Sequence, residues 1–445
     1  MNKTDMETEQ YTLTPTQQQI FNAIETTRNN FLIMGKPGTG KSVLTRAIWK
    51  DGQKKYTLCS PTGLAAVNIG GWTLHSVFRI PVSRGIIHPN YTQYPKDERT
   101  LDSIRYGIKT LIIDECSMVR ADIFDYIDRL LRYVKGDNRP FGGIQVVLVG
   151  DFFQLAPVAV REERSQLKEY GYRSEFIFDS QVWKDANFQT ILLTEVLRQK
   201  GDAKFIEFLH KARTGDLSPT DLKALDKLVG NPTNMRISLT GTNRQADEIN
   251  GQHLASINEP ARQFTAEVYG NWPAFPVDEK LSLKVGAQVM VRMNKADVPP
   301  GTKAKDADSK VVNGTIGKVT GFADDGSYVT ILTETGHSVN IYRRTWELKI
   351  KKKQEDDRWH ELVVASFTQI PLSLAWAISI HKSQGQTFEQ VHIDATKIFA
   401  AGQLYVALSR CRTLEGISLQ QRLTTNKFWP NKAVINFYNE NNLEP

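Results

Sequence analysis

The chain contains few cysteines and no long apolar run, and both absences narrow what it can be. Its 445 residues include three cysteines, Cys59, Cys116 and Cys411, which lie far apart and show no C-x-x-C spacing. A disulfide framework or a zinc site is therefore not expected, and a reducing compartment fits better. No apolar stretch approaches the roughly 18 residues that a membrane-spanning helix requires.

The first ten residues, MNKTDMETEQ, lack the features of a targeting segment. They are polar and partly acidic, without the apolar core of a signal peptide or the arginine-rich pattern of a transit peptide. We therefore expect a soluble, cytoplasmic protein of bacterial or phage-like type that is associated with the nucleoid. The excess of positive over negative side chains is also small, with 56 Lys and Arg residues against 49 Asp and Glu residues. The resulting net charge of +7 permits a nucleic-acid groove without demonstrating one.

Short apolar runs that end in polar or glycine-containing turns recur along the first half of the chain. Such runs are typical of strands buried in a parallel sheet: FLIMG (31–35), TLIIDE (110–115) and VVLVGD (146–151). Helix-like segments lie between them, at 41–49 and 123–134. A second series follows at RISLTGT (236–242), WAISIH (376–381) and QVHID (390–394). Alternating strands and helices predict an α/β fold with doubly wound parallel sheets, whose ligands bind at the carboxyl ends of the strands.

The character of the chain changes inside the second series. Short alternating runs and glycine turns predict a β-rich, barrel-like insertion: KVGAQVMVRMN (284–294), GTIGKVTGF (314–322) and YVTILTETGHSVNI (328–341). The charged segments beside these runs, 294–310 and 349–358, are interpreted as solvated loops or a hairpin tip.

GKPGTGKS, residues 35–42, matches the phosphate-loop pattern G-x-x-x-x-G-K-[ST] in full. Its glycines allow the backbone to wrap closely around a polyphosphate, and the start of the following helix adds a positive end. Lys41 is expected to reach the β- and γ-phosphates and Ser42 to ligate Mg²⁺. The predicted nucleotide-binding residues here are Gly35, Pro37, Gly38, Thr39, Gly40, Lys41 and Ser42.

Two further segments supply polar groups at strand ends. Asp114 and Glu115 follow a predicted strand, so Asp114 is expected to hold Mg²⁺ and Glu115 to act as general base on the attacking water. Taken alone, the pair could equally be two surface acids, and the phosphate loop favours the catalytic reading. Gln154, in GDFFQLAPV (150–158), is a candidate contact for the γ-phosphate. Phe152 and Phe153 in the same segment are expected to be core residues rather than base-stacking groups.

Six segments occur in one order along this chain. They are SPTGLAAVNIGGWTLHSVF (60–78), LIIDECSM (111–118), PFGGIQVVLVGDFFQLAPV (140–158), LTEVLRQ (193–199), ISIHKSQGQTF (378–388) and LYVALSRCR (404–412). Together they resemble the petite-integration-frequency (PIF-type) family of superfamily 1B DNA helicases, related to RecD and Dda. The resemblance runs from about residue 13 to residue 418. It implies ATP- and Mg²⁺-dependent 5′→3′ movement on single-stranded DNA, with duplex separation ahead of the motor.

The resemblance also assigns roles to single residues. It implies that Gln17 recognises adenine, that Arg198 and Arg410 neutralise charge at the γ-phosphate, and that Gln384 and Gly385 contact the nucleotide. The DNA contacts that it implies are Thr62, His75, His381 and Lys382. In HKSQGQT the hydroxyl, amide and cationic donors suit phosphate and sugar contacts. Judged without the resemblance, His381 could be a core histidine and Lys382 a solvated lysine. Pro37 and Ala156 depart from the family pattern without removing a functional group.

The predicted organisation is two RecA-like lobes with small inserted domains. The first lobe takes 1–80 and 99–198, the second takes 199–295 and 367–445, and a β-rich, SH3-like domain takes 296–366. Residues 81–98 are the candidate wedge hairpin, or else a plain surface loop. The chain reads as a minimal helicase core that works as a monomer on single-stranded DNA and tailed or forked duplex, and G-quadruplex DNA is a further admissible ligand. A DNA-stimulated translocase without unwinding, a nucleotide-switch protein and an RNA helicase are the alternatives.

Overall fold

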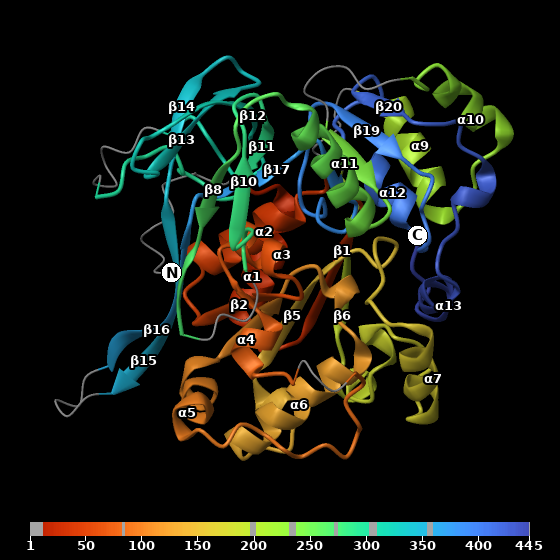
Figure 1. Cartoon of the computed structure of the whole chain (residues 1–445). Helices are drawn as coiled ribbons and strands as arrows, with labels where there is room; N and C mark the ends of the chain where they lie inside the picture. The colour runs from red at the N-terminus through yellow and green to blue at the C-terminus, as the bar shows by residue number, and fades with distance from the viewer. Residues whose placement is uncertain are drawn as a thin grey trace. The chain divides into compact units, whose positions relative to one another are not determined.

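The computed structural model describes residues 12–81, 85–195, 202–230, 237–270, 275–301, 309–353 and 359–444 (Figure 1). The chain divides into two compact units. The first comprises Met1–Leu222, Ala400–Ser409 and Thr424–Pro445, and the second comprises Lys223–Phe399 and Arg410–Leu423. Two segments near the end of the chain therefore return to the first unit. None of the helices in the described part has the length and apolar character needed to cross a lipid bilayer.

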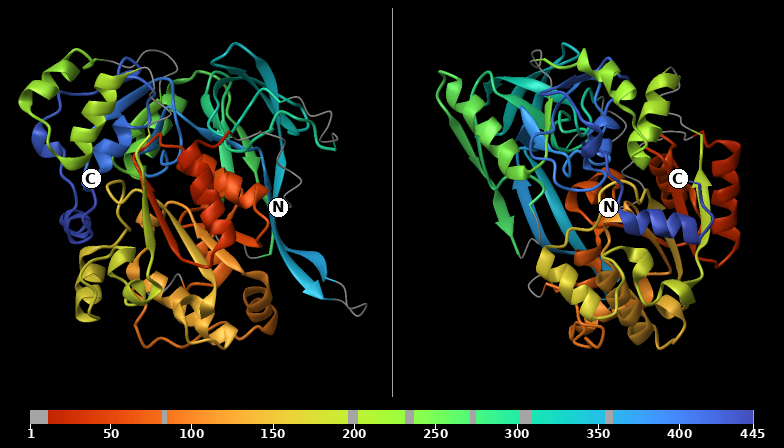
Figure 2. Two further views of the ribbon diagram at one scale, coloured as in Figure 1. Left: turned by 180° about the vertical axis from the view of Figure 1, so that it is seen from behind. Right: turned by 90° about the vertical axis from the view of Figure 1, so that its right-hand side faces the viewer.

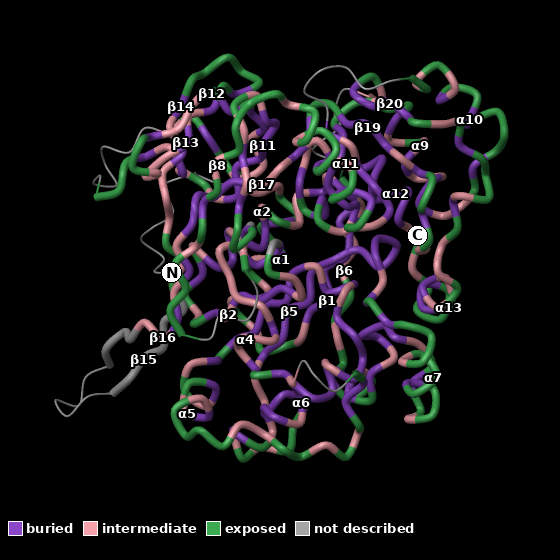
Figure 3. Tube along the Cα trace, in the orientation of Figure 1, coloured by how far each residue is buried: buried purple, intermediate pink, exposed green. Residues whose placement is uncertain are grey.

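The first unit is built on a six-stranded parallel sheet in the order β3-β2-β4-β5-β1-β6. Its strands are β1 (Phe31–Gly35), β2 (Tyr56–Ser60), β3 (Trp72–Thr73), β4 (Thr110–Ile113), β5 (Gln145–Gly150) and β6 (Gln189–Leu193). Every residue of β1, β4 and β5 is buried (Figure 3), as expected for strands covered on both faces. The three predicted strands are therefore confirmed. Because all strands run the same way, the residues after β1, β4 and β5 emerge at one edge of the sheet.

Helices connect and cover these strands. They are α1 (Pro15–Thr26), α2 (Lys41–Asp51), α3 (Gly63–Ile69), α4 (Leu74–Phe78), α5 (Glu98–Gly107), α6 (Ala121–Lys135), α7 (Arg161–Glu169), α8 (Trp183–Ala186), α9 (Ala203–Thr214), α12 (Gln403–Leu408) and α13 (Lys432–Glu440), while α10 (Pro219–Asp226) crosses into the second unit. Apolar side chains of α1 and α2 pack with those of the sheet strands in one buried cluster. The helices predicted at 41–49 and 123–134 are present as α2 and α6. Short 3₁₀ turns lie at Cys116–Met118, Pro140–Gly143, Ile177–Asp179 and Thr425–Lys427.

The predicted lobes and the compact units differ in where they place three helices. From the order of the strands, we assigned all residues after 198, apart from the β-rich insertion, to the second lobe. Helices α9, α12 and α13, however, belong to the first unit. The reason is side-chain packing over long sequence distances. The Tyr438 hydroxyl on α13, for example, lies 3.6 Å from Met34 Sδ on β1.

The candidate wedge, 81–98, contains neither a strand nor a hairpin in its described residues, 81 and 85–98. The hairpin prediction is therefore wrong for this part of the segment. Pro89 and Pro95 carry no N–H for a β-ladder, and the Ile87 N–H is used by the Asp122 carboxylate at 2.8 Å. Tyr94 stacks on Tyr133 of α6 with 5.0 Å between the ring centroids. The segment is thus a loop attached to α6.

The second unit contains a four-stranded parallel sheet in the order β18-β7-β19-β20. Its strands are β7 (Ile237–Thr240), β18 (Ala377–Ser379), β19 (Val391–Asp394) and β20 (Ile417–Leu419), and α11 (Asn243–Ser256) packs against it. The strands predicted from 236–242, 376–381 and 390–394 are confirmed. Strand β7 is separated from β18 and β19 by more than 130 residues, because the β-rich insertion lies between β7 and β18.

The insertion forms antiparallel sheets. A five-stranded sheet has the order β14-β13-β12-β11-β17, a three-stranded one β15-β16-β9, and a pair β10-β8. The strands are β8 (Arg262–Thr265), β9 (Glu267–Tyr269), β10 (Lys280–Leu283), β11 (Gln288–Val291), β12 (Ile316–Phe322), β13 (Tyr328–Thr333), β14 (Ser338–Tyr342), β15 (Arg344–Lys353), β16 (Trp359–Gln369) and β17 (Leu372–Leu374). Figure 2 shows β15 and β16 as a long arm. These sheets extend beyond the predicted 296–366 at both ends, because β11 pairs with both β12 and β17.

Candidate active site

The phosphate loop joins β1 to α2. Gly38 and Gly40 have φ angles of 83° and 79°, in the left-handed region that favours glycine, and Gly40 is the residue before α2 begins. Gly35 is required for a different reason. A Cβ atom there would lie 2.6 Å from Thr39 Oγ1 and 3.0 Å from the Leu193 carbonyl oxygen. The loop can keep this path only with glycine at these positions.

Lys41 and Thr39 hold the loop in shape. The Lys41 ammonium donates to the carbonyl oxygens of Gly35, at 2.6 Å, and Lys36, at 3.1 Å. The Thr39 hydroxyl donates to the Lys36 carbonyl at 2.9 Å. The cation therefore lies at the mouth of the loop, where the phosphate oxygens of a nucleotide would compete for its N–H groups. Ser42 is the second residue of α2 and lies at the positive end of that helix.

Asp114 and Glu115 follow β4 at the same edge of the sheet. Asp114 is buried, and its carboxylate accepts a 3.0 Å hydrogen bond from the Glu115 N–H. Burial, together with the Glu115 carboxylate, raises the pKa of Asp114 to about 7, and the charge of Lys41 acts against this rise. Glu115 has a φ of 53°, a left-handed conformation in which non-glycine residues are strained. The structure thus brings the predicted metal ligand near Lys41.

The segment after β5 carries Gln154, which is buried. The Asp151 carboxylate accepts the Phe153 N–H at 3.1 Å, and the Asp151 carbonyl accepts the Gln154 N–H at 3.0 Å, so Asp151 shapes a tight turn. The ring of Phe152 packs 5.0 Å from that of Phe178, and both Phe152 and Phe153 are buried. The interpretation of these two phenylalanines as core residues is in accord with this packing.

Gln17 lies beside the phosphate loop. Its side-chain Nε2 is 3.4 Å from the carbonyl oxygens of both Thr39 and Gly40, and its Oε1 accepts the Thr14 N–H at 3.0 Å. Gln17 therefore completes the N-terminal cap of α1 and ties this helix to the loop. Its predicted role in adenine recognition remains a prediction.

The segment HKSQGQT follows β18 in the second unit. Ser383, Gln384 and Gln386 are buried, Lys382 is exposed, and Gly385 has a φ of 78°. Arg410 is also buried, and its Nη1 donates to the Gln386 carbonyl at 3.3 Å. The structure therefore brings Arg410 next to this segment, a neighbour that sequence patterns did not indicate.

The DNA-contact candidates are spread over both units. Thr62 and His75 belong to the first unit, where the Thr62 hydroxyl accepts the Ala65 N–H at 3.2 Å at the start of α3. His381, in the second unit, lies parallel to the ring of Phe399, with 6.2 Å between centroids and 16° between planes. Phe399 is 64% exposed and was missed by sequence analysis, because a single aromatic residue carries no periodic signal.

Burial lowers the pKa of His75 and His381. At His75 the Arg120 charge adds to the effect of burial. Both rings are therefore neutral at pH 7, so they can contact a strand through hydrogen bonds and ring faces but not through charge. Arg198 lies outside the described residues, and its predicted role at the γ-phosphate remains a prediction.

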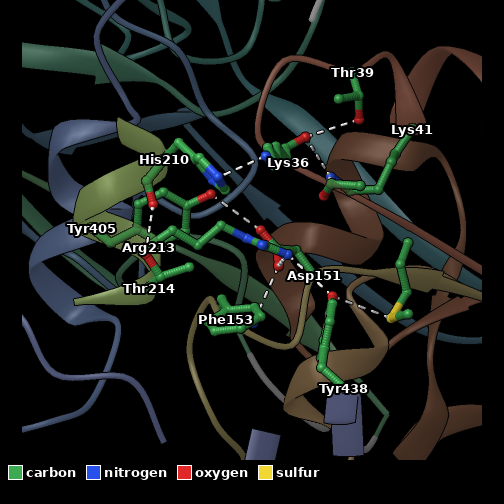
Figure 4. A network of polar contacts seen from close by, with 12 residues as sticks. Lys36, Thr39, Lys41, Asp151, Phe153, His210, Arg213, Thr214, Tyr405 and Tyr438 are labelled. Carbon is green, nitrogen blue, oxygen red and sulfur yellow. Dashed lines mark hydrogen bonds and ion pairs between the residues drawn. The ribbon is translucent and has the colours of Figure 1, made fainter. Parts of the chain in front are cut away.

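Sequence analysis also missed a buried polar cluster behind the phosphate loop. Figure 4 shows its side chains, which come from the loop, from the end of β5 and from three helices: Lys36, Asp151, Phe153, His210, Arg213, Tyr405 and Tyr438. Asp151 and Arg213 form an ion pair at 3.1 Å whose side chains are 0% and 3% exposed. These partners are 62 residues apart in the chain, so no local pattern links them.

A strand, a glycine-rich phosphate loop and a helix, with two carboxylates at the end of a nearby strand of the same parallel sheet, define a P-loop nucleotide hydrolase. A second parallel sheet and an antiparallel insertion extend this frame. Comparison with known proteins specifies the family. Residues 12–223 match the model of the PIF1-like helicases. The chain belongs to the PIF1-like helicase family.

Relatives from fungi and bacteria match nearly the whole chain. ATP-dependent DNA helicase RRM3 of Saccharomyces cerevisiae is 32% identical over 96% of this chain and 67% of its own length. ATP-dependent DNA helicase PIF1 of Emericella nidulans is 31% identical over 95% of this chain, which spans only 62% of that protein. ATP-dependent DNA helicase Pif1 of Bdellovibrio bacteriovorus is 30% identical, with coverages of 92% and 87%.

Solved structures show the same fold. The Pif1 helicase from Bacteroides, as a double mutant, is 35% identical with a TM-score of 0.83, covering 98% of each chain. Bacteroides Pif1 in complex with ADP-AlF4 is 35% identical with a TM-score of 0.82, covering 97% of this chain and 98% of that one. Bacteroides Pif1 bound to single-stranded DNA is 36% identical with a TM-score of 0.72, covering 96% and 97%. The RecA-like α/β fold expected from the sequence is confirmed.

Proposed function

We propose that this protein is an ATP-dependent DNA helicase that moves 5′→3′ along single-stranded DNA and separates duplex ahead of it. The observation that carries the proposal is the phosphate loop, with Lys41 bound to its carbonyls and Asp114 close by, inside the unit that contains the PIF1-like region. The solved complexes of Bacteroides Pif1 with single-stranded DNA and with ADP-AlF4 support it.

Ser42 and Asp114 are proposed to hold Mg²⁺. A hydroxyl and a carboxylate are the hard oxygen donors that this ion prefers. Burial raises the pKa of Asp114, and a bound cation would lower that pKa again by stabilising the ionised carboxylate. When bound, Mg²⁺ would supply positive charge against the phosphate oxygens. Lys41 would leave its two loop carbonyls and bind the phosphates, together with the backbone N–H groups of the loop.

Glu115 is proposed to accept the proton of the attacking water, with Gln154 placing that water or the γ-phosphate. Arg198 and Arg410 keep the role that the resemblance implies, which is to neutralise charge that develops on the γ-phosphate. Gln384 and Gly385 would contact the nucleotide, and Thr62, His75, His381 and Lys382 would contact the strand. Uncharged His75 and His381 suit sugar and base contacts, while Lys382 suits a phosphate.

The proposed partners are single-stranded DNA and tailed or forked duplex. The basic motor is proposed to be a monomer that is associated with the cell's DNA. G-quadruplex DNA is proposed as a further ligand. A second candidate function is a translocase that does not unwind duplex. One observation favours it: the described part of the wedge segment is a loop attached to α6 and not a projecting hairpin.

ATP hydrolysis with different nucleic acids tests the proposal. Initial rates would be measured without nucleic acid, with single-stranded DNA and with single-stranded RNA of the same sequence, using wild-type protein and Lys41→Ala. We expect strong stimulation by DNA, weaker stimulation by RNA and no hydrolysis by the variant. Hydrolysis that is indifferent to DNA would favour a nucleotide switch, and equal stimulation by RNA would favour an RNA helicase.

A further inference from the structure

The Asp151 carboxylate is the centre of the buried cluster behind the phosphate loop. One oxygen, Oδ1, accepts the Phe153 N–H and an Arg213 Nη2–H, each at 3.1 Å. The other oxygen, Oδ2, accepts the Tyr405 hydroxyl at 3.3 Å. The same group therefore shapes the turn that carries Gln154 and binds side chains from α9 and α12 (Figure 4).

Arg213 is the cation of this cluster and is itself held from several sides. Its Nη2 also donates to the Tyr438 hydroxyl at 3.1 Å, and its guanidinium carbon lies 4.0 Å from the centre of the Phe153 ring. Burial alone would lower the pKa of Arg213, but the charge of Asp151 and the two tyrosines outweigh burial and raise it. The side chain is thus charged at all working pH values.

Stability alone does not account for this arrangement. The Arg213 Nε and Nη1 atoms are buried and have no hydrogen-bond partner among the residues that the structure describes. Buried ion pairs of this kind contribute little or nothing compared with apolar residues of the same volume, and unmatched donors make the balance worse. What a planar, charged fork does provide is a fixed geometry between the groups that it joins.

The helix that carries Arg213, α9, also contacts the phosphate loop. His210 lies three residues before Arg213 on α9, and its Nδ1 is 3.0 Å from the ammonium of Lys36, the second residue of the phosphate loop. Burial, the Lys36 charge and the Arg213 charge lower the pKa of His210, so the neutral ring accepts the Lys36 hydrogen bond. Helix α9 therefore contacts the loop with one side chain and the Gln154 turn with another.

Helix α12 contacts the same turn through its backbone. Gly402, the residue before this helix, has a φ of 71°, and a Cβ there would lie 2.3 Å from the Phe153 carbonyl oxygen and 2.8 Å from that of Gln154. Tyr405 on α12 adds its hydrogen bond to Asp151. The helix ends at Leu408, two residues before Arg410.

We propose that Arg213 is a positioning residue for ATP hydrolysis, which fixes the Gln154 turn relative to the phosphate loop and to the helix that leads to Arg410. This inference rests on the proposed ATP hydrolysis. Arg213 does not itself contact the nucleotide in this scheme. It acts through Asp151, because any shift of that carboxylate moves the Phe153 N–H and with it the turn that carries Gln154. Displacements of about 1 Å at such a distance can lower turnover roughly 100-fold.

The test compares Arg213→Lys with a matched control, Arg120→Lys. Lysine keeps the charge but cannot bind Asp151 and Tyr438 in one plane. Arg120 forms a comparably buried ion pair with Asp122, at 2.7 Å, within the same unit. We expect Arg213→Lys to lower kcat at saturating ATP and DNA by about tenfold or more, with the KM for ATP changed by less than about twofold. Arg120→Lys should lose a similar amount of thermal stability and keep its kcat.

Two hydroxyl deletions keep the proposal testable if Arg213→Lys does not fold. Tyr438→Phe and Tyr405→Phe each remove one hydrogen bond of the cluster and preserve its volume, and each should lower kcat about two- to fivefold. Wild-type kcat in Arg213→Lys, or in both tyrosine variants when Arg213→Lys is not folded, would overturn the proposal. A wild-type protein without ATP hydrolysis would instead refute the proposed function itself, so the two failures are distinguishable.

Discussion

Replacing Gly402 by alanine separates backbone strain from displacement of the Gln154 turn. The added Cβ would lie 2.3 Å from the Phe153 carbonyl oxygen, about 1 Å short of ordinary van der Waals contact. The Gln154 carbonyl oxygen would lie 2.8 Å away. Because both oxygens belong to the backbone, no side-chain rotation can relieve the collision. Either α12 or the turn must therefore move by about 1 Å. We expect kcat for ATP hydrolysis to fall about tenfold to 100-fold.

Gly136 offers a control with the same strain and no collision. It follows α6 with a φ of 65°, and a Cβ there would meet no atom of the described part of the chain within 4 Å. A left-handed alanine costs roughly 1–2 kcal/mol at either position. The melting temperature falls by about 2–4 °C per kcal/mol in a unit of this size. Both variants should show at least this loss, measured by thermal denaturation. Wild-type kcat in Gly402→Ala, despite its lower melting temperature, would refute the reasoning.

Three further predictions concern the base, the histidines and the strand. Glu115→Gln should bind a fluorescent ATP analogue as tightly as wild type while its kcat falls about 100-fold or more, since proton removal but not binding is lost. Equal losses of affinity and kcat would contradict the assignment. Burial lowers the pKa of His75, His210 and His381 below the ordinary 6.5, so the unfolded chain binds protons first as the pH falls. The contribution of these neutral histidines to the free energy of unfolding is complete above about pH 6.5 and falls as the pH drops below that value. Between pH 7.5 and 5.5 the raised pKa of Asp114 acts in the opposite direction, so the test compares the two proteins: the change in unfolding free energy caused by the histidines should be smaller in His210→Gln than in wild type, as measured by denaturant unfolding. An equal pH dependence in the variant and in wild type would count against the account. Phe399→Ala should weaken binding of single-stranded DNA about fivefold or more, if its exposed ring stacks on a base, and leave ATP hydrolysis without DNA intact. Unchanged affinity in a fluorescence anisotropy titration would exclude that contact.

The parts of the fold that sequence analysis predicted are those with a local signal. Strands β1, β4 and β5 are largely apolar runs, because both of their faces are covered. Strand β1 ends with a glycine, and an aspartate follows each of β4 and β5. The phosphate loop is recognisable because positive φ angles and close backbone contacts restrict its composition. These constraints act within a few residues, so they can be read from spacing.

The parts that it did not predict depend on pairing between distant segments. The Asp151–Arg213 ion pair and the placement of α13 beside β1 join positions 62 and 404 residues apart. The ends of the β-rich insertion were misjudged because β17 pairs with β11 across more than 70 residues. In the segment 81–98, tyrosines and prolines suggested a hairpin. The carboxylate that binds the backbone of this segment, however, belongs to Asp122 on α6. The periodicity of apolar residues in a sequence does not reveal partners that are so far apart in the chain.

The most direct test of the helicase assignment is unwinding of two partial duplexes of equal length and sequence, one with a 5′ and one with a 3′ single-stranded tail. Strand separation would be followed by fluorescence after addition of ATP, in wild type and in Lys41→Ala. The account predicts separation of the 5′-tailed substrate alone, and none by the variant. Separation of the 3′-tailed substrate, or of neither one despite DNA-stimulated ATP hydrolysis, would contradict it; the latter result would leave a translocase.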